Sequence, residues 1–473
     1  MEQSFDAVVI GAGPGGYVCA IRLAQLGKKT AVIEKEDLGG VCLNVGCIPS
    51  KALIYAASLY HKIQHEGEKL GILGQLSVDL KSMQTWKNQV VKKLTGGVEG
   101  LLKANKVSLF RGNARIKSAA QVNVEGSSPV TLQTKAIIIA TGSSVLEVPA
   151  LPFNGKTIVS STEALALTSI PKKMVVIGGG FIGLEIGTVY AKLGSPVTIV
   201  EATPQLLGKT DPELVAVVMK RLKTLGVRVL LQTQAVGIKE KDPSQENSLH
   251  LKVQPSQGSE EVLEADCILV AIGRKPNSTG FGLQELGVKT DGRGNIVTNS
   301  QGATNIGGIY AIGDVTGAPQ LAHRASMDGL LVAETLATGK GYRDYRTVPW
   351  AVFCDPEIAS TGLSETEAKE KGIAYRVGKF PFAANGRALS TQETEGLIKV
   401  LVEEKTEAIL GVQIVGPEAS NLIAEATLAI EMGACAEDVV RTIHTHPTLP
   451  EAFPEAVENA FAKSIHVFKP IRS

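Results

Sequence analysis

One pattern occurs twice in this chain of 473 residues, and it constrains the fold more than any other feature. In the first copy Gly11, Gly13 and Gly16 form G-x-G-x-x-G, and Glu34 follows 18 residues after the last glycine. The second copy repeats the same residue types 167 positions further on, at Gly178, Gly180, Gly183 and Glu201. The chain therefore contains a duplicated unit.

Each copy is predicted to form a strand, a helix and a second strand. The glycines follow a continuously apolar run, such as Ala7 to Ile10, which is typical of a buried parallel strand. Apolar residues at helical spacing come next, and a glycine, Gly27 or Gly194, then marks the helix end. A second apolar run ends in the acidic residue. We expect two dinucleotide-binding units of this kind.

The residue types fit dinucleotide chemistry. The first glycine permits a sharp turn, the second lets the backbone approach a pyrophosphate, and the third allows tight helix–strand packing. The pyrophosphate then lies on the N–H groups of the helix N-terminus, and the acid accepts hydrogen bonds from a ribose. A single glycine pattern could be only a tight turn, but two complete copies predict two dinucleotides, FAD and a nicotinamide coenzyme.

Composition excludes several classes of protein. Lys and Arg number 48 against 47 Asp and Glu, so a nucleic acid or an anionic membrane is not the expected partner. Six cysteines are too few for a disulfide-built secreted scaffold. Uninterrupted apolar runs are of strand length, too short to span a membrane, and the first residues lack the features of a signal peptide. We expect a soluble cytoplasmic protein.

Further apolar runs at 136–144, 267–276 and 307–316 end in glycine turns and complete the sheets. Asp314 follows the third run, and an acid at the carboxyl end of a parallel strand points to the ligand crevice. We expect it to bind the FAD ribityl chain, with a helix N-cap as the alternative. These runs suggest an FAD-binding domain at 1–149 to which 278–347 return, a nicotinamide-binding domain at 150–277, and an α+β domain at 348–473.

Only the first copy carries a pair of cysteines after its acid. Cys42 and Cys47 are separated by four residues, and Pro49 is suited to a first helical turn, so a helix should begin near Cys47. A helix N-terminus favours thiolate, and Lys51 adds positive charge one turn later. A redox dithiol is the interpretation, and two buried structural cysteines are the alternative. No second pair of Cys or His residues lies nearby in the sequence, so a zinc site is not expected.

The C-terminal segment contains His444, His446 and Glu451. Pro447 restricts His446 to extended backbone, and Glu451 could accept the imidazole N–H and raise its basicity. This pattern suggests a general acid–base, although a metal pair or a solvated turn would also explain it.

These residues together resemble the pyridine nucleotide–disulfide oxidoreductases, and within them the enzymes that oxidise dihydrolipoyl groups. The resemblance covers nearly the whole chain through the segments 11–16, 39–51, 178–185, 271–274, 311–314 and 444–451. Position 41 is Val where many members have Thr. The implied fold is α/β, with two Rossmann-like dinucleotide-binding domains and a C-terminal α+β dimerisation domain.

The resemblance also implies roles for individual residues. Cys42 would exchange with substrate, Cys47 would lie beside the flavin, and His446, oriented by Glu451, would come from the partner subunit of a homodimer. FAD would be held by Gly11, Gly13, Gly16, Glu34, Lys51, Ala114, Gly142, Asp314 and Ala322. NAD would be held by Gly178, Gly180, Gly183, Glu185, Glu201, Val236, Ala271, Gly273 and Arg274, and Glu185 would pair with Lys51. No metal is expected.

The implied activity is oxidation of dihydrolipoyl groups with reduction of NAD⁺. The implied partners are a lipoyl-bearing acyltransferase of a 2-oxoacid dehydrogenase complex or the lipoyl carrier of glycine cleavage. Two other functions compete. A reductase of glutathione, mercuric ion or another disulfide would have the same domains. Glu201 disfavours binding of NADPH, because its carboxylate would repel the 2′-phosphate. A structural docking subunit would not need Cys42, Cys47, His446 and Glu451.

Overall fold

Two compact units make up the chain. The computed structural model describes residues 2–239 and 249–468. Residues 1–170 and 271–344 form unit 1, and residues 171–270 and 345–473 form unit 2. Each copy of the repeat lies in its own unit.

Unit 1 is built on a sheet with the strand order β3-β2-β1-β6-β5-β4, in which β17 also pairs with β6. Strands β1, β2, β3 and β17 run parallel to their neighbours, as expected for a βαβ unit, whereas β4, β5 and β6 form an antiparallel meander. The strands are β1 (Glu2–Ile10), β2 (Thr30–Glu34), β3 (Ser108–Arg111), β4 (Asn113–Ser118), β5 (Gln121–Glu125), β6 (Val130–Ile139) and β17 (Ile309–Ala311). Short strands β7 (Ser143–Val145) and β16 (Arg274–Pro276) pair with each other, and β8 (Ile158–Val159) lies in the same unit.

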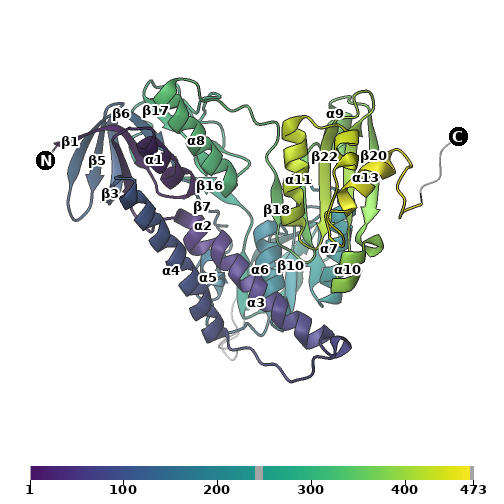
Figure 1. Cartoon of the computed structure of the whole chain (residues 1–473). Helices are drawn as coiled ribbons and strands as arrows, with labels where there is room; N and C mark the ends of the chain where they lie inside the picture. Colours follow the sequence, from purple (N-terminus) through teal and green to yellow (C-terminus); the bar gives the residue numbers. More distant parts are fainter. Residues whose placement is uncertain (1, 240–248, 469–473) are drawn as a thin grey trace. The chain divides into compact units, whose positions relative to one another are not determined.

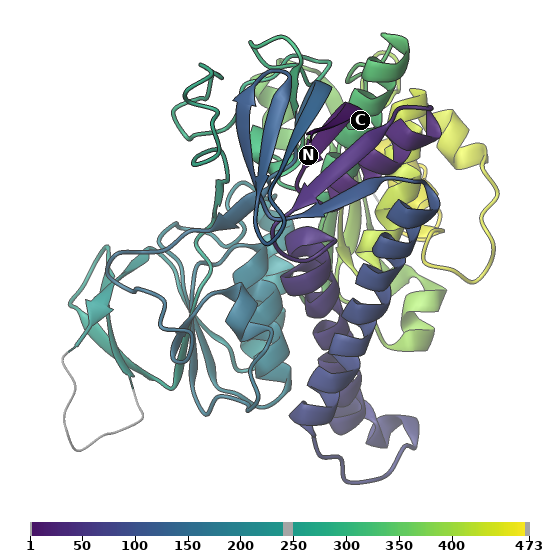
Figure 2. The same cartoon turned by 90° about the vertical axis from the view of Figure 1, so that its left-hand side faces the viewer.

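Helices α1 (Pro14–Gln25) and α8 (Ala322–Thr338) lie side by side against this sheet (Figure 1). Their approach is close: a Cβ on Gly15 would lie 2.9 Å from the Ala325 carbonyl oxygen, and one on Gly329 would lie 2.6 Å from the Gly15 oxygen. The other helices of unit 1 are α2 (Gly40–Val45), α3 (Cys47–Glu66), η1 (Glu68–Leu70), α4 (Leu80–Ala104), α5 (Ser161–Ala164) and η2 (Gly313–Thr316). Helices α3 and α4 pack together and are joined by residues 67–79 (Figure 2).

Unit 2 contains the second copy and the C-terminal segment. A parallel sheet orders β11 (Arg228–Leu230), β10 (Val197–Val200), β9 (Met174–Ile177) and β15 (Cys267–Val270), flanked by α6 (Phe181–Lys192) and α7 (Pro212–Thr224). An antiparallel sheet follows, with β12 (Thr233–Ile238), β13 (Leu249–Pro255) and β14 (Glu261–Ala265).

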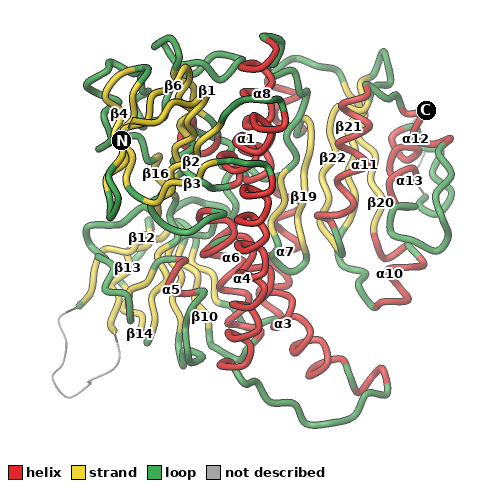
Figure 3. The backbone as a smooth tube through the Cα atoms, turned by 60° about the vertical axis from the view of Figure 1, so that its left-hand side comes forward, coloured by secondary structure: helices red, strands yellow, loops and turns green. Residues whose placement is uncertain are grey.

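The C-terminal segment forms a sheet with the order β18-β19-β22-β21-β20, antiparallel throughout. Helix α11 (Ala419–Met432) packs on β19 and β22, and α13 (Ala452–Ala460) packs on β20 and β21 (Figure 3). The strands are β18 (Trp350–Val352), β19 (Glu357–Gly362), β20 (Tyr375–Pro381), β21 (Leu397–Glu403) and β22 (Ile409–Gly416). The remaining helices are α9 (Glu365–Glu370), η3 (Phe382–Ala384), α10 (Gly386–Thr391) and α12 (Ala436–Arg441).

Buried ion pairs join the C-terminal sheet to the second copy, which explains why both belong to unit 2. The Lys399 ammonium lies 2.6 Å from an Asp211 oxygen, 3.2 Å from Glu213 and 2.5 Å from Glu365. Asp355 lies 2.9 Å from the Lys192 ammonium and 3.1 Å from Arg221. These carboxylates hold helices α6 and α7 against the C-terminal segment.

The expectation that no segment is long and apolar enough to span a membrane needs correction. Helical residues Gly40–Glu66, 27 in all, meet that test by length and composition. Polar residues such as Asn44 and Lys51 interrupt the apolar run while the helical stretch continues, so no uninterrupted apolar run marks it in the sequence. A core helix of a soluble protein passes the same test, and this stretch carries both candidate redox cysteines.

Candidate functional site

The first glycine-rich turn joins β1 to α1. Gly11 has a φ of +100°, which only glycine adopts readily. A Cβ on Gly16 would lie 1.9 Å from the Gly11 carbonyl oxygen, so no larger residue fits there. Helix α1 begins directly after Gly13, and its first N–H groups have no partner within the helix. The turn is therefore a helix N-terminus of the kind that binds anions, and a pyrophosphate can approach its backbone closely.

Glu34 ends β2 and closes this turn. Its Oε2 accepts a hydrogen bond from the Ala12 N–H over 2.7 Å, and its Oε1 accepts one from Glu36 over 2.8 Å. The carboxylate is thereby fixed beside the glycine turn. Each of its oxygens has a second lone pair, so the same group can accept hydrogen bonds from ribose hydroxyls.

The second copy repeats this geometry bond for bond. Gly178 has a φ of +106°, and a Cβ on Gly183 would lie 2.1 Å from the Gly178 oxygen. Glu201 accepts hydrogen bonds from Gly179 N–H at 2.6 Å and Thr203 N–H at 2.8 Å. The duplicated sequence pattern is thus a duplicated three-dimensional site, and both copies fit a dinucleotide.

The cysteine pair follows the first site along the chain. Gly39 and Gly40 both have positive φ, and the Gly39 N–H donates to the Ala12 carbonyl at 2.8 Å, which joins this loop to the glycine turn. Cys42 lies in α2, and Cys47 is the first residue of α3, as the sequence predicted. Both cysteines are thiols in this structure.

The two sulfurs are hydrogen-bonded to each other. The bond to Cys47, followed by burial and the Cys47 charge, raises the pKa of Cys42, while Lys51 acts in the opposite direction. In the reduced pair Cys42 therefore keeps the proton. Cys47 occupies the helix N-terminus, where thiolate is favoured. Adjacent thiols of different acidity are suited to disulfide exchange.

Asp314, Ser143 and Arg274 form a chain of hydrogen bonds. The Ser143 hydroxyl donates to Asp314 at 2.6 Å, and the Arg274 guanidinium donates to the Ser143 hydroxyl at 2.8 Å and to its carbonyl at 2.6 Å. Burial lowers the pKa of Arg274, and the Asp314 and Cys47 charges oppose that effect. Arg274, predicted for the nicotinamide coenzyme, therefore lies beside the residue predicted for the flavin. Sequence reasoning did not find Ser143.

Asp328 is a second residue that sequence reasoning missed. It lies on α8, is 1% exposed, and accepts hydrogen bonds from Arg343 Nε at 2.7 Å and Gly313 N–H at 3.3 Å. Arg324 Nε lies 3.3 Å from the same carboxylate, and its other nitrogens donate to the Gly317 carbonyl and the Thr316 hydroxyl at 2.7 and 3.0 Å. This network fixes the η2 turn that presents Asp314.

The remaining predicted flavin residues all lie in unit 1. Lys51 is on α3 and Ala114 on β4; Gly142, with a φ of +68°, precedes β7, and Ala322 opens α8. The residues predicted to bind the nicotinamide coenzyme are divided between the two units. Glu185, Glu201 and Val236 lie in unit 2, while Ala271, Gly273 and Arg274 lie in unit 1. The Glu185–Lys51 pair would join the two units and stays a prediction.

Glu185 has a defined partner within unit 2. It lies on α6, is 4% exposed, and its Oε1 accepts a hydrogen bond from the Phe353 N–H at 3.1 Å. The C-terminal segment thus helps to orient a residue that the sequence predicts for the second dinucleotide site.

His446 and Glu451 form the predicted pair. His446 Nδ1 lies 2.8 Å from Glu451 Oε1, and the Thr448 N–H donates to Glu451 Oε2 at 2.6 Å. Burial would raise the pKa of Glu451, but the hydrogen bonds from Thr448 and His446 lower it below its usual value. Because the ionised carboxylate only accepts, Nδ1 carries the hydrogen and Nε2 keeps its lone pair. The exposed ring can therefore act as a base at Nε2.

His444 is held differently. Its Nε2 lies 2.8 Å from Glu425 and its Nδ1 lies 2.9 Å from the Thr442 carbonyl, so both ring nitrogens have partners. Within residues 2–239 and 249–468 no group of three or more His, Cys, Asp and Glu could hold a metal ion. The geometry favours His446 as the base over a metal pair.

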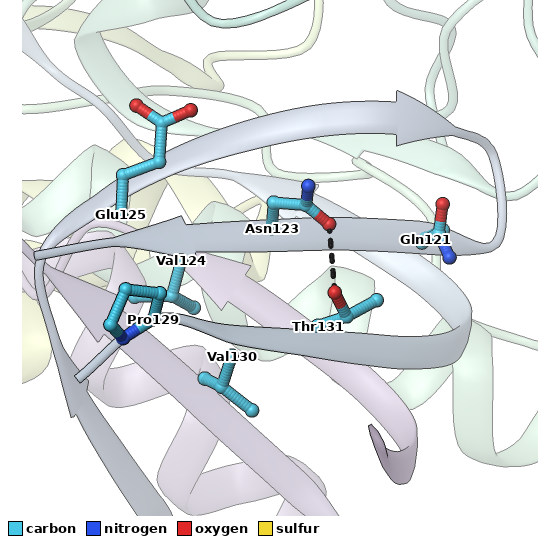
Figure 4. Close-up of a pocket in the computed structure, with 7 residues that line it drawn as sticks. All are labelled: Gln121, Asn123, Val124, Glu125, Pro129, Val130 and Thr131. Carbon is cyan, nitrogen blue, oxygen red and sulfur yellow. Dashed lines mark hydrogen bonds between the residues drawn. The ribbon is translucent and has the colours of Figure 1, made fainter. Parts of the chain in front are cut away.

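A hollow on unit 1 carries none of this chemistry. It lies along β5 and β6, where the Thr131 hydroxyl donates to Asn123 at 3.2 Å (Figure 4). The residues that line it belong to the antiparallel meander and include none of the predicted site residues.

Comparison with known proteins decides the family. Residues 5–329 match the family model described as pyridine nucleotide-disulphide oxidoreductase, and residues 348–457 match its dimerisation domain. The chain belongs to this family. The family assignment confirms the predicted fold class, two dinucleotide-binding domains of α/β type followed by an α+β dimerisation domain.

Members of the family are similar over nearly the full length. A dihydrolipoyl dehydrogenase of Geobacillus stearothermophilus is 47% identical over 98% of this chain and 97% of its own, and a mitochondrial one of Pisum sativum is 45% identical over 98% and 92%. Among solved structures, LpdA from Mycobacterium tuberculosis has a TM-score of 0.87 at 25% identity, covering 96% of this chain and 99% of that one. The flavoprotein disulfide reductase RclA from Escherichia coli has 0.84 at 28%, with the same coverage.

Proposed function

We propose that this chain is an NAD⁺-dependent dihydrolipoyl dehydrogenase. It oxidises the two thiols of a dihydrolipoyl group to a cyclic disulfide and reduces NAD⁺ to NADH. The observation that carries the proposal is the hydrogen-bonded pair Cys42 and Cys47, fixed at a helix N-terminus directly beside a dinucleotide site. Relatives bearing this name are similar from end to end, which supports the same activity here.

The protein's own residues supply proton transfer and disulfide exchange. His446 accepts a proton at Nε2 from one dihydrolipoyl thiol, and Glu451 stabilises the resulting imidazolium. The substrate thiolate attacks Cys42 of the Cys42–Cys47 disulfide, which displaces Cys47 as thiolate. The second substrate thiol then attacks the substrate sulfur of this mixed disulfide, closes the lipoyl ring and passes its proton to the departing Cys42 sulfur, so the two electrons of the substrate reside in the enzyme dithiol.

FAD fits the first site. Gly11, Gly13, Gly16 and Glu34 would hold its pyrophosphate and adenosine ribose, and Asp314 would accept hydrogen bonds from the ribityl chain. Lys51, Ala114, Gly142 and Ala322 would complete the contacts. When bound, FAD supplies the two-electron chemistry that links a dithiol to a nicotinamide.

NAD fits the second site, which Gly178, Gly180, Gly183 and Glu201 form. The Glu201 carboxylate, held by two backbone N–H groups, is suited to a ribose 2′-hydroxyl and repels a 2′-phosphate, which favours NAD over NADP. Glu185, Val236, Ala271, Gly273 and Arg274 are the other proposed contacts.

The family's dimerisation domain supports a homodimer. We further infer a lipoyl-bearing partner, either the acyltransferase of a 2-oxoacid dehydrogenase complex or the carrier of glycine cleavage, and a cytoplasmic location. The three-part division at 1–149 with 278–347, 150–277 and 348–473 remains our proposal for the functional domains. Near-equal numbers of acidic and basic residues support a protein partner over nucleic acid.

One assay tests the activity. Purified protein containing FAD is mixed with dihydrolipoamide and NAD⁺, and NADH is followed by its absorbance. We expect turnover with NAD⁺ and little with NADP⁺. Turnover of NADPH with glutathione disulfide or mercuric ion, and none with dihydrolipoamide, would assign the chain to another reductase of the family.

A further inference from the structure

The far end of the dithiol helix carries two histidines on one face. His61 and His65 lie in the last two turns of α3, and residues four apart on a helix are neighbours. Their rings are stacked, with centroids 4.1 Å apart and planes inclined by 29°. His65 is exposed and His61 is half-buried. None of the proposed catalytic or cofactor roles uses either residue.

The hydrogen bonding of His65 defines its tautomer. Its Nδ1 lies 3.0 Å from the His61 carbonyl oxygen. A carbonyl only accepts, so Nδ1 carries the hydrogen and Nε2 keeps its lone pair. Histidines that ligate metals are commonly oriented in this way, with the second ring nitrogen donating to a backbone carbonyl or a carboxylate.

The local charge also suits a cation. The C-terminal end of a helix carries partial negative charge, and α3 ends at Glu66, directly after His65. Glu68 follows in η1, and Lys62 and Lys69 balance the two carboxylates. The helix end therefore favours a bound cation.

We propose that His61 and His65 bind one divalent late-transition-metal ion, such as Cu²⁺, Ni²⁺ or Zn²⁺, as a two-point chelate whose other positions are filled by water. Imidazole nitrogen suits these metals, and a metal–nitrogen distance of about 2 Å places two neighbouring ligand nitrogens about 3 Å apart, a separation that rotation of the two side chains can give to residues four apart on a helix. At 1.5 Å rise per residue the site lies about 24 Å along the helix from Cys47. It is therefore separate from the dithiol.

Titration of the oxidised holoenzyme with NiCl₂ tests the site, because the Cys42–Cys47 disulfide then offers no thiolate to the metal. The variants are His61→Gln, His65→Gln and both together, with His466→Gln as the matched control, another surface histidine bonded to a neighbouring group. We expect one equivalent per chain that either single substitution weakens about tenfold or more and the double substitution removes. The control should bind like the unaltered protein.

Electron paramagnetic resonance of the Cu²⁺ form provides a second measurement. Two imidazole nitrogens should couple to the copper in the unaltered protein and one in each single variant. Far-UV circular dichroism shows whether α3 persists in the variants. An equivalent of Ni²⁺ retained by the folded double variant, or a spectrum with a single nitrogen in the unaltered protein, would overturn the proposal.

Discussion

At the scale of single residues, Glu34 and Glu201 provide a matched pair, because each closes its glycine turn through two backbone N–H groups. Glu201→Ala removes a charged acceptor proposed to bind the NAD ribose. The loss should cost about 1–3 kcal/mol of binding, which raises the KM for NAD⁺ on the order of tenfold or more. Discrimination against NADP⁺ should shrink as well. Steady-state kinetics with both coenzymes measures the effect.

Glu34→Ala is the control for this prediction, since the same change in the first copy should lower the FAD content, whereas the molecules that retain FAD should keep the unaltered KM for NAD⁺. The assignment of Glu201 fails if the unaltered protein uses NADP⁺ as readily as NAD⁺. It also fails if Glu201→Ala lowers FAD content instead of coenzyme affinity.

Asp328 should control how tightly FAD is held. Asp328→Asn removes the charge that balances Arg324 and Arg343 and loosens the turn that presents Asp314. Breaking a buried ion pair costs about 3–5 kcal/mol of stability, and part of that loss should appear as faster flavin release. Flavin fluorescence after dilution measures the release rate, and visible circular dichroism reports the flavin environment.

Asp291→Asn is the control, because Asp291 also organises a turn of unit 1 through backbone N–H groups but is exposed. It should leave flavin release unchanged. If Asp328→Asn unfolds more easily but retains FAD as firmly as the unaltered protein, the aspartate stabilises the fold without positioning Asp314.

The residues that sequence could identify are those whose role is local. Glycines in a sharp turn and an acid at a strand end follow from spacing, because the glycine turns and their closing bonds are set within 25 residues. Asp328 could not be found in this way. A charge in a helical pattern normally indicates a solvent-facing position, and its burial depends on Arg343, which a separate loop brings to it.

At the scale of elements, the sequence predicted those helices and strands that are bounded by glycine turns. Gly27 and Gly194 follow the ends of α1 and α6 as predicted, and the apolar runs predicted at 136–144, 267–276 and 307–316 contain the end of β6, β15 and β17. Strands β4 and β5 and the sheet β12–β14 were not predicted. Their short strands carry polar side chains at alternate positions and gain their order from pairing with neighbours.

The loop between β18 and β19 should couple stability to pH. Burial would raise the pKa of Asp355, but Lys192 and Arg221 lower it below the usual value. A carboxyl whose pKa is lower in the folded state stabilises the protein above its unfolded pKa, and this stabilisation is lost as the pH falls through the folded pKa. Asp355→Asn should therefore destabilise unit 2 by about 3 kcal/mol at neutral pH. The difference from the unaltered protein should vanish in acid.

Urea unfolding at a series of pH values from neutral to below 4 measures this difference. Asp6→Asn provides the exposed counterpart, since Asp6 pairs with Lys135 at the surface and its pKa is lowered too. That substitution should change stability little at any pH, because water screens the pair. A constant effect of Asp355→Asn across the pH series would show that the ionisation of Asp355 does not contribute to stability.

At the scale of the whole molecule, the proposed site combines residues that are remote in the chain. His446 follows Cys42 by about 400 residues, and the two lie in different units. His446 belongs to the segment that matches the family's dimerisation domain. We propose that this domain forms a twofold interface and lends His446 to the partner subunit's dithiol, so that each active site is built from two chains.

Mixed dimers test this arrangement. A Cys42→Ser chain is combined with a His446→Gln chain, and dimers containing one of each are isolated by different affinity tags. If the base is shared across the interface, one site of the hybrid contains both substitutions and the other contains neither, because a twofold interface exchanges equivalent residues. Activity should then return to about half that of the unaltered dimer. If each histidine served its own chain, both hybrid sites would be damaged, and the hybrid would remain as inactive as its parents.

FAD content should be the same in all three dimers, because neither substitution touches the first glycine turn, and equal flavin content excludes a loss of cofactor as the cause of any inactivity.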